Sequence, residues 1–247
     1  MLGLPDHVRT CLFDLDGVLT RTAKVHAAAW KEMFDDYLRT RAEREGAPFV
    51  AFDAVRDYDQ YVDGLPREDG VRTFLASRGV ELPEGTSDDG PDQETVNGLG
   101  TRKNEMVLRR IREQGVEAYE GSVAYVRAAR DAGLHRAVVS SSANCRDVLI
   151  AAGIEELFEE RIDGITVREH HLRGKPAPDT YLAAARVLGV EPETAAVFED
   201  ALAGVEAGRA GGFGLVVGVD RTGQAEELRR HGAGIVVDDL SELLEAR

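Results

Sequence analysis

The sequence predicts an α/β fold, with a Rossmann-like parallel sheet core and one inserted α-helical domain. Short apolar, β-branched runs recur along the chain, and amphipathic helical patterns separate them, which is typical of βαβ units in a parallel sheet. This rhythm is interrupted once, between about residues 22 and 117, where we find only helical patterns. Several of the strand-like runs end in polar residues, and in open α/β sheets the ligand lies at those carboxyl ends.

The elements of the core are expected in two segments, residues 1–21 and 118–247. The first strand is predicted within residues 8–16, directly before an acid-rich turn. Further strands are predicted at 136–140, 195–199, 214–219 and 234–237. Helical patterns separate them at roughly 121–132, 144–152, 178–188, 201–210 and 224–231.

The insert is predicted to span residues 22–117. Ala29 and Met33 share one face of a first helix, and a second helical pattern runs through residues 103–114. Residues 81–94 are acidic, contain glycine and proline and carry no basic residue, which favours a solvated loop.

Composition limits the partners. The formal net charge is −15, and an acidic surface repels nucleic-acid backbones and anionic lipids. No stretch approaches the roughly 20 apolar residues that a membrane helix needs. We therefore expect a cytoplasmic monomer with neither a nucleic-acid partner nor a membrane partner. A phosphorylated substrate would also be repelled, so a phosphate site here must carry its own cations.

The two cysteines, Cys11 and Cys145, lie far apart in the sequence, each beside an apolar, strand-like segment. We expect buried thiols and no disulfide. No Cys/His pattern has the spacing of a zinc site.

An acid-rich turn follows the first predicted strand. Asp14 and Asp16 are two positions apart, so at the end of an extended segment both carboxylates can face one pocket. One carboxylate can attack a phosphorus atom and hold a metal, while the other carries a proton to and from an oxygen. Gly17 permits a sharp turn and the close approach of a phosphate. The alternative is a solvated turn, since Asp and Gly are common turn residues.

Two further motifs offer donors to a phosphate. Ser140, with Ser141 after it, ends a predicted strand where hydroxyls and the free N–H groups of a helix start can bind phosphate oxygens. Capping of that helix is the alternative. Lys175 stands in a proline-fixed loop, residues 174–179, and can present a positioned cation to a phosphoryl group. Its alternative is a surface lysine beside a helix start.

A pair of acids, Glu199 and Asp200, ends another predicted strand. Magnesium prefers oxygen ligands and is usually held by one or two carboxylates together with phosphate and water. Asp200 and Asp14 would supply such a pair, so Mg²⁺ is the expected cofactor. The alternative is that Asp200 only caps a helix that begins at Ala201.

In this order along the chain, the four motifs resemble those of the haloacid dehalogenase superfamily of phosphotransferases. The strings DLDGVLT, GKPAPD and VFEDALAGVEAG carry the resemblance, which covers nearly the whole chain. It implies that Asp14 is the nucleophile and becomes an aspartyl phosphate. It also implies that Asp16 is the general acid/base and binds magnesium through its backbone carbonyl, while Glu199 and Asp200 complete the metal site.

The same resemblance implies how the transferred phosphoryl group is held. Ser140 and Lys175 would bind its oxygens, and the Lys175-Pro176 peptide bond would be cis. The helical insert at residues 22–117 would be a cap domain.

Within the superfamily, the chain resembles the branch of sugar-phosphate mutases. The resemblance implies a set of substrate-contacting side chains: Thr22, His26, Arg67, Lys103, Ser142 and Asn144. Asp63 departs from the pattern, because that branch usually carries a lysine four residues before the arginine. The expected reaction is the interconversion of β-glucose 1-phosphate and glucose 6-phosphate. The alternative is a sugar-phosphate phosphatase that uses the same aspartates; a receiver-like module phosphorylated on Asp14 would need neither a cap nor Asp16.

Overall fold

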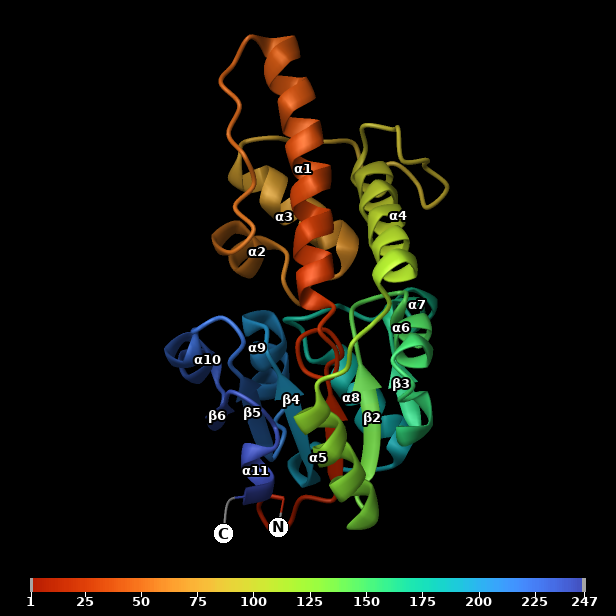
Figure 1. Cartoon of the computed structure of the whole chain (residues 1–247), viewed down its shortest axis with the longest axis vertical. Helices are drawn as coiled ribbons and strands as arrows, with labels where there is room; N and C mark the ends of the chain where they lie inside the picture. The colour runs from red at the N-terminus through yellow and green to blue at the C-terminus, as the bar shows by residue number, and fades with distance from the viewer. Residues whose placement is uncertain (1, 246–247) are drawn as a thin grey trace. The chain divides into compact units, whose positions relative to one another are not determined.

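The core of the protein is built on a parallel sheet. The computed structural model describes residues 2–245, and within this range six strands form one sheet in the order β3-β2-β1-β4-β5-β6 (Figure 1). The strands are β1 (Thr10–Phe13), β2 (His135–Val139), β3 (Glu160–Ile162), β4 (Ala195–Glu199), β5 (Leu215–Val219) and β6 (Ile235–Val237). All neighbouring pairs are parallel, which confirms the predicted α/β fold class.

The centre of the sheet is β1, whose four residues are all buried. Phe13 pairs with Val138 on one neighbouring strand and with Phe198 on the other. Because the strands are parallel and in this register, the residues that follow them emerge at one edge of the sheet. Strands that are buried on both faces of a parallel sheet consist of nearly continuous apolar residues. This pattern is why the central strands could be predicted from the sequence.

The strand order reverses between β1 and β4. From β1 the chain continues outward through β2 and β3, and from β4 it continues the other way through β5 and β6. Such a reversal leaves a crevice at the carboxyl ends of the two strands, where open α/β sheets bind their ligands. The turn after β1 and the end of β4 carry the predicted carboxylates.

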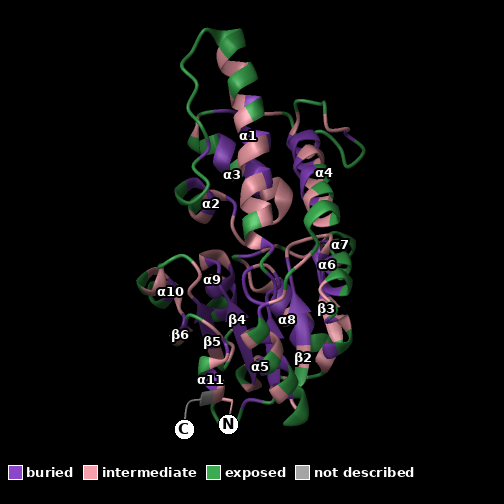
Figure 2. Ribbon diagram, in the orientation of Figure 1, coloured by how far each residue is buried: buried purple, intermediate pink, exposed green. Residues whose placement is uncertain are grey.

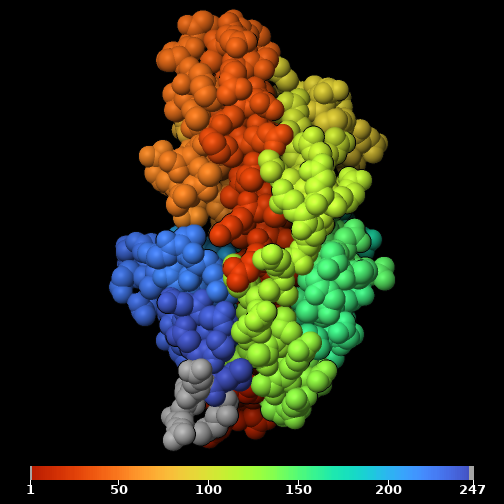
Figure 3. Space-filling model, viewed as in Figure 1, coloured from red at the N-terminus to blue at the C-terminus, as the bar shows by residue number. Residues whose placement is uncertain are grey.

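Helices cover both faces of this sheet. Figure 1 shows α5 in front of the sheet and α8 behind it, and Figure 2 shows that the strands between them are buried. In the space-filling view, the side chains of α5 lie over the centre of the core on the face that is seen (Figure 3). The core helices are α5 (Glu120–Asp131), α6 (Cys145–Ala151), α7 (Gly164–Glu169), α8 (Asp179–Leu188), α9 (Leu202–Ala210), α10 (Ala225–His231) and α11 (Glu242–Glu245), with 3₁₀ turns at Glu155–Leu157 and Pro192–Thr194.

The predicted element list lacked β3 and the helix α7 that follows it. β3 has only three residues, of which Glu160 and Arg161 are charged, and only β2 lies beside it. An edge strand needs no continuous apolar run, so it leaves little pattern in the sequence. Asp163 then caps α7, since its Oδ1 accepts from the backbone N–H groups of Ile165 and Thr166.

Close contacts divide the chain into two units. One comprises residues 1–21, 64–66 and 116–247, and the other residues 22–63 and 67–115. The second unit contains α1 (Ala23–Glu45), α2 (Arg56–Tyr61), α3 (Arg67–Ser77) and α4 (Val96–Gln114). The division into a core and a cap domain at residues 22–117 remains our proposal.

An aromatic cluster forms the centre of the second unit. The ring of Phe34 on α1 lies 5.1 Å from that of Trp30, 5.3 Å from that of Phe52 and 4.2 Å from that of Phe74 on α3. Aromatic pairs at these distances add to the stabilisation that burial alone provides. This unit therefore has an apolar core of its own.

The last helix of the second unit, α4, begins earlier than the predicted 103–114. Two glycines, Gly98 and Gly100, lower the helical propensity of its first turns. Thr95 compensates by accepting a hydrogen bond from the N–H group of Gly98 at 2.9 Å. A Cβ atom at position 98 would lie 2.2 Å from the carbonyl oxygen of Gln93, so only glycine fits there.

Two further expectations can be compared with the structure. Cys11 and Cys145 are both buried, free thiols, as predicted, and burial raises the pKa of Cys11 to about 12. Among the described residues, we find no helix that combines the length and the apolar composition required to traverse a bilayer.

Candidate active site

Asp14 is the first residue after β1, and its carboxylate is buried. Its backbone N–H donates to the carbonyl of Phe198 at 3.0 Å, which fixes the turn against β4. The side chain is 9% exposed, and its Oδ1 lies 2.5 Å from the Nζ atom of Lys175. A carboxylate that is held this rigidly by a charged partner is well placed to act as a nucleophile.

Lys175 joins three core segments that are far apart in the sequence. Its ammonium group donates to Oδ1 of Asp14 at 2.5 Å, to Oε1 of Glu199 at 2.5 Å and to the carbonyl of Val139 at 3.2 Å. The side chain is 1% exposed, so all three of its protons are used inside the protein. The Lys175-Pro176 bond is cis, as predicted.

The electrostatics of the pair follow from its burial and its neighbours. Burial raises the pKa of Asp14, the charges of Glu199 and Asp16 raise it further, and the ammonium of Lys175 opposes this rise. Burial would lower the pKa of Lys175, but the two carboxylates that it contacts outweigh this effect and raise it. Lys175 is therefore a fixed positive charge in the neutral pH range.

Glu199 is the last residue of β4 and is completely buried. Besides Lys175, its Oε1 accepts a hydrogen bond from the hydroxyl of Tyr181 at 2.8 Å, and its Oε2 accepts one from the N–H group of Ala201 at 3.2 Å. The sequence analysis did not identify Tyr181. It lies on the apolar face of α8, where a tyrosine is expected to be a core residue.

The carboxylates of Asp14, Glu199 and Asp200 form an acidic cluster. Each offers an oxygen atom, and these oxygens lie within 4.8 Å of one another. Three buried carboxylates and one ammonium leave an excess of negative charge in a place where isolated charges are costly. Oxygen ligands at this spacing suit a hard divalent cation, so the residues fit the expected metal.

Gly17 lies where two turns of the site meet. Its φ of 90° is in the left-handed region, and a Cβ atom there would lie 1.7 Å from Oδ2 of Asp200. Its N–H donates to the carbonyl of Thr20 at 2.8 Å, which closes the turn that carries Asp16. The turn after β1 and the turn after β4 therefore touch directly.

The carboxylate of Glu199 packs against Gly204, where no larger residue fits. A Cβ atom at this position of α9 would lie 1.7 Å from Oε1 and 1.9 Å from Cδ of Glu199. We expect Gly204→Ala to displace this carboxylate and to weaken divalent-cation binding about tenfold or more, because cation sites tolerate little misplacement. Calorimetric titration with Mg²⁺ measures this effect. Ala203→Gly, next to Gly204 on the same helix, is the control and should leave the Mg²⁺ affinity unchanged. Gly211→Ala is unsuitable, because its new Cβ atom would lie 2.5 Å from the ring of Phe213.

The serine run after β2 mainly organises its own turn. Ser140 is buried, and its Oγ accepts from the N–H group of Ser142 at 3.1 Å, while Oγ of Ser142 accepts from that of Asn144 at 3.1 Å. Ser141 donates its hydroxyl to the carbonyl of Gly64 at 2.7 Å. The carbonyl of Val139, directly before Ser140, accepts from Nζ of Lys175 at 3.2 Å. Contacts of the three serine hydroxyls with phosphate remain predictions.

Within the second unit, several of the predicted substrate residues lie together. The Nζ atom of Lys103 lies 2.9 Å from Nδ1 of His26 and 4.7 Å from the centre of the Trp30 ring. Thr22 is buried directly before α1. Arg67, however, donates to the carboxylate of its neighbour Glu68 at 2.7 and 2.9 Å, a partner that the sequence did not indicate.

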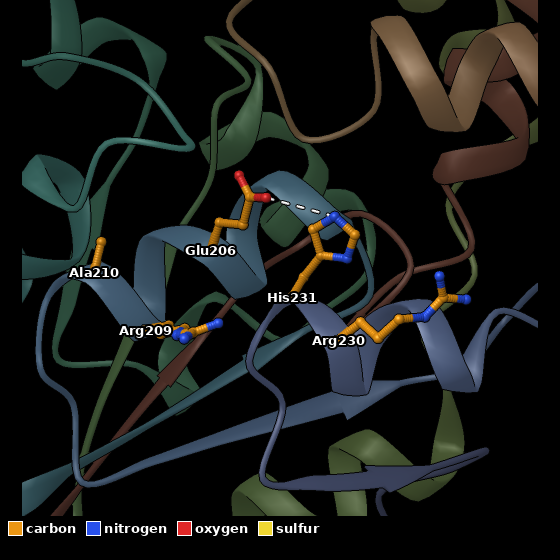
Figure 4. Close-up of a pocket in the computed structure, with 5 residues that line it drawn as sticks. All are labelled: Glu206, Arg209, Ala210, Arg230 and His231. Atoms are coloured by element: carbon orange, nitrogen blue, oxygen red, sulfur yellow. Dashed lines mark ion pairs between the residues drawn. The ribbon is translucent and has the colours of Figure 1, made fainter.

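A separate pocket lies between α9 and α10 (Figure 4). Its wall contains an ion pair between Nε2 of His231 and Oε1 of Glu206 at 3.5 Å. The other lining residues are Arg209, Ala210 and Arg230. None of these side chains belongs to the acidic cluster, so this pocket is distinct from the site described above.

Comparisons with known proteins show the family of the chain. The sequence model of the haloacid dehalogenase-like hydrolases matches residues 8–212. A β-phosphoglucomutase of Mycobacterium tuberculosis is 59% identical over 247 residues, which cover 99% of this chain and 94% of that protein. The β-phosphoglucomutase of Bacillus subtilis is 29% identical, covering 96% and 92% respectively.

A solved structure supports the fold independently. The β-phosphoglucomutase from Clostridium difficile superposes with a TM-score of 0.73 at 24% identity, covering 96% of this chain and 93% of that one. At this level of identity, the likeness concerns the fold alone.

Proposed function

The chain belongs to the haloacid dehalogenase-like hydrolases and is an enzyme of that family, and from this membership we propose that it interconverts β-glucose 1-phosphate and glucose 6-phosphate. The observation that carries the proposed chemistry is the buried contact of Asp14 with Lys175 beside the acidic cluster. The substrate is inferred from the mycobacterial relative, since the 59% identity extends over the full chain.

In the proposed reaction, Asp14 carries the phosphoryl group. One of its carboxylate oxygens attacks the phosphorus atom at C1 of bound glucose 1,6-bisphosphate, the bond from phosphorus to the C1 oxygen breaks, and an aspartyl phosphate and glucose 6-phosphate form. Asp16 gives a proton to the departing sugar oxygen. In the other half, Asp16 removes a proton from the C6 hydroxyl of β-glucose 1-phosphate, and that oxygen takes the phosphoryl group from Asp14, which regenerates glucose 1,6-bisphosphate.

Cationic and polar groups stabilise the transferred phosphoryl group. Lys175 already lies 2.5 Å from the attacking carboxylate, so its positive charge is in place before charge develops on the phosphoryl oxygens. Ser140 lies at the end of the adjacent strand β2 and would donate its hydroxyl to the same group.

We assign Mg²⁺ as the cofactor, held by Asp14, Glu199 and Asp200 with the backbone carbonyl of Asp16. The fit rests on the buried oxygen cluster described above. When bound, the ion neutralises negative charge on the phosphoryl oxygens. In the absence of the ion, burial favours the protonated form of Asp14, and a nearby divalent charge favours the carboxylate that attacks.

A sugar-phosphate phosphatase is the second candidate, because water can replace the sugar hydroxyl in the second step. Asp63 is the observation that favours it. An acid stands where the mutase branch usually carries a lysine, and its N–H group ends α2 by donating to the carbonyl of Tyr58 at 3.0 Å. The absence of this cation would weaken the binding of a substrate that carries a doubly charged phosphate.

The two candidates are separated by one assay of the purified protein. It contains Mg²⁺, β-glucose 1-phosphate and a trace of glucose 1,6-bisphosphate, and both glucose 6-phosphate and free phosphate are followed. We expect glucose 6-phosphate to form well ahead of phosphate. Release of phosphate alone would replace the mutase with the phosphatase, and the absence of both products would remove the proposed substrate.

Arg67 offers a test of the substrate residues. If its guanidinium leaves Glu68 to bind the far phosphate, Arg67→Ala should raise KM about tenfold or more, as expected for the loss of a charge-assisted hydrogen bond. The concentration of Mg²⁺ that gives half-maximal activity should stay the same. Arg72→Ala, on the same helix and paired with Glu84, is the matched control. An unchanged KM in Arg67→Ala would contradict this assignment.

A sugar phosphate is thus the proposed small-molecule partner. The monomeric state and the cytoplasmic location remain predictions from composition.

A further inference from the structure

The loop after β5 contacts both turns that carry the predicted metal ligands. We propose that Arg221 and Gln224 of this loop are positioning residues that hold the two turns in register for the divalent cation. The inference rests on the proposed function, because it concerns the same cation site. It adds residues that lie outside the four motifs.

Arg221 binds the turn after β1. Its Nε donates to the carbonyl of Gly17 at 2.7 Å, and its Nη1 donates to the carbonyl of Asp238 at 2.6 Å. Its side chain is 15% exposed, and the bond to Gly17 is partly shielded from water. Gly17 directly follows Asp16, whose backbone carbonyl is a predicted ligand of the cation. The hydrogen bond from Arg221 to the Gly17 carbonyl therefore fixes the backbone next to this ligand.

Tyr119 supports Arg221 from the side. The guanidinium carbon of Arg221 lies 3.6 Å from the centre of the Tyr119 ring, a close cation–π contact. The N–H group of Tyr119 donates to the carbonyl of Leu19 at 2.9 Å, so the tyrosine is itself attached to the end of the same turn. The turn is thus held at Gly17 and at Leu19.

Gln224 binds the turn after β4. Its Nε2 donates to the carbonyl of Asp200 at 3.1 Å, directly at a predicted cation ligand. Arg221 and Gln224 are three residues apart in one short loop, so the loop connects the Gly17 carbonyl with the Asp200 carbonyl.

Asp220 keeps this loop rigid. Its Oδ1 accepts hydrogen bonds from the N–H groups of Thr222, Gly223 and Gln224 at 3.2, 2.7 and 2.9 Å, and its Oδ2 accepts one from Ala225 at 3.1 Å. Four bonds from one carboxylate leave the loop few alternative conformations. Because the loop is rigid, its bonds to Gly17 and Asp200 can hold these two residues at a fixed distance from each other.

The two turns are also coupled to each other through direct contact. Gly17 packs so closely on Asp200 that there is no room for a Cβ atom between them. Magnesium demands near-ideal octahedral geometry, and binding constellations must be held to within about 0.5 Å. Loss of either bond to the loop should therefore loosen the ligands of both turns.

The test compares Arg221→Met with Arg229→Met. Arg229 lies in α10, its side chain is 51% exposed, and it forms an ion pair with Glu226 on the same helix, which makes it a matched control. We expect Arg221→Met to raise the Mg²⁺ dissociation constant, measured by calorimetry, about tenfold, as the loss of a hydrogen bond from a charged donor implies. Arg229→Met should leave this constant unchanged.

Hydrogen–deuterium exchange of the metal-free protein supplies a second readout. In Arg221→Met, exchange should accelerate in peptides covering residues 14–20 and 199–204 and stay as in the wild type elsewhere in the sheet. Gln224→Ala should give a smaller effect, centred on residues 199–204. Arg221→Lys keeps the charge but cannot form both bonds of the fork, so it should act in the same direction if Arg221→Met folds poorly.

A lower melting temperature with an unchanged Mg²⁺ constant and unchanged exchange at both turns would overturn the inference, because it would reduce Arg221 to a structural residue. The exchange result does not depend on the substrate. Failure of the mutase assay therefore removes the proposed reaction, whereas unchanged exchange removes the positioning role.

Discussion

Asp14→Asn should reduce turnover by a factor on the order of 10⁴ or more, since the proposed reaction requires the Asp14 carboxylate to accept the phosphoryl group covalently. The asparagine keeps the shape of the side chain but lacks a nucleophilic carboxylate oxygen. The measurement is the rate of glucose 6-phosphate formation at saturating substrate and Mg²⁺.

The same variant should not be less stable than the wild type. Burial raises the pKa of Asp14, which means that its charge is unfavourable in the fold, and Lys175 keeps Glu199 as a partner. We therefore expect an equal or higher melting temperature for Asp14→Asn without metal. Asp147→Asn, on the exposed face of α6, is the control for the chemical change. Turnover within tenfold of the wild type in a folded Asp14→Asn protein would exclude Asp14 as the nucleophile.

Lys175→Met is the second substitution with a large expected effect. It removes the only ammonium that contacts both Asp14 and Glu199 among the described residues, and it leaves two buried carboxylates without their common partner. Breaking a buried ion pair in this way costs about 3 kcal/mol or more of folding free energy. Loss of a positioned cation should also lower kcat by roughly 10²–10³-fold.

The stability loss of Lys175→Met should depend on pH, with a sign that identifies its cause. Without the ammonium that opposes the effect of burial, the pKa of the Asp14 carboxyl is raised further above its unfolded value, so the native state binds more protons than the unfolded state. Stability then falls as the pH rises. The deficit relative to the wild type, measured by urea denaturation, should therefore be larger at pH 8 than at pH 5. A deficit that is the same at both pH values would point to lost packing instead. Lys31→Met is the control, because the side chain of Lys31 is 43% exposed.

The central features of the site could be predicted because each lies next to an apolar strand. Asp14, Ser140 and Glu199 follow buried runs that have neighbours on both sides, and parallel register then brings them to one edge of the sheet. The cis bond before Pro176 and the lysine beside it came from the resemblance of the motif strings, and the structure places Lys175 on Asp14. Local sequence and strand order together were sufficient for these residues.

The supporting residues could not be predicted, because their role depends on contacts between distant segments. Tyr181 occupies an ordinary core position of a helix, and only the folded chain shows its hydroxyl on Glu199. Arg221 lies 204 positions from the carbonyl that it binds. No local pattern in the sequence distinguishes such a side chain from a surface arginine.

The partner of Arg67 shows a different limit of the sequence analysis. The motif string marked Arg67 as a substrate residue, and in the structure Arg67 begins α3 with its guanidinium on the adjacent Glu68. The guanidinium can bind either the Glu68 carboxylate or a substrate phosphate. The competition between these charges decides which one it binds, and the position of Arg67 in the sequence does not show the outcome.

The most direct test of the account is to locate the transferred phosphoryl group. The enzyme with Mg²⁺ is mixed with glucose 1,6-bisphosphate, quenched in acid and reduced with borohydride, which converts an aspartyl phosphate into homoserine, and the peptides are then read by mass spectrometry. We expect homoserine at position 14 in the wild type and none in Asp14→Asn. An unmodified Asp14 in protein that is turning over substrate, or a phosphoryl group on another residue, would contradict the central claim.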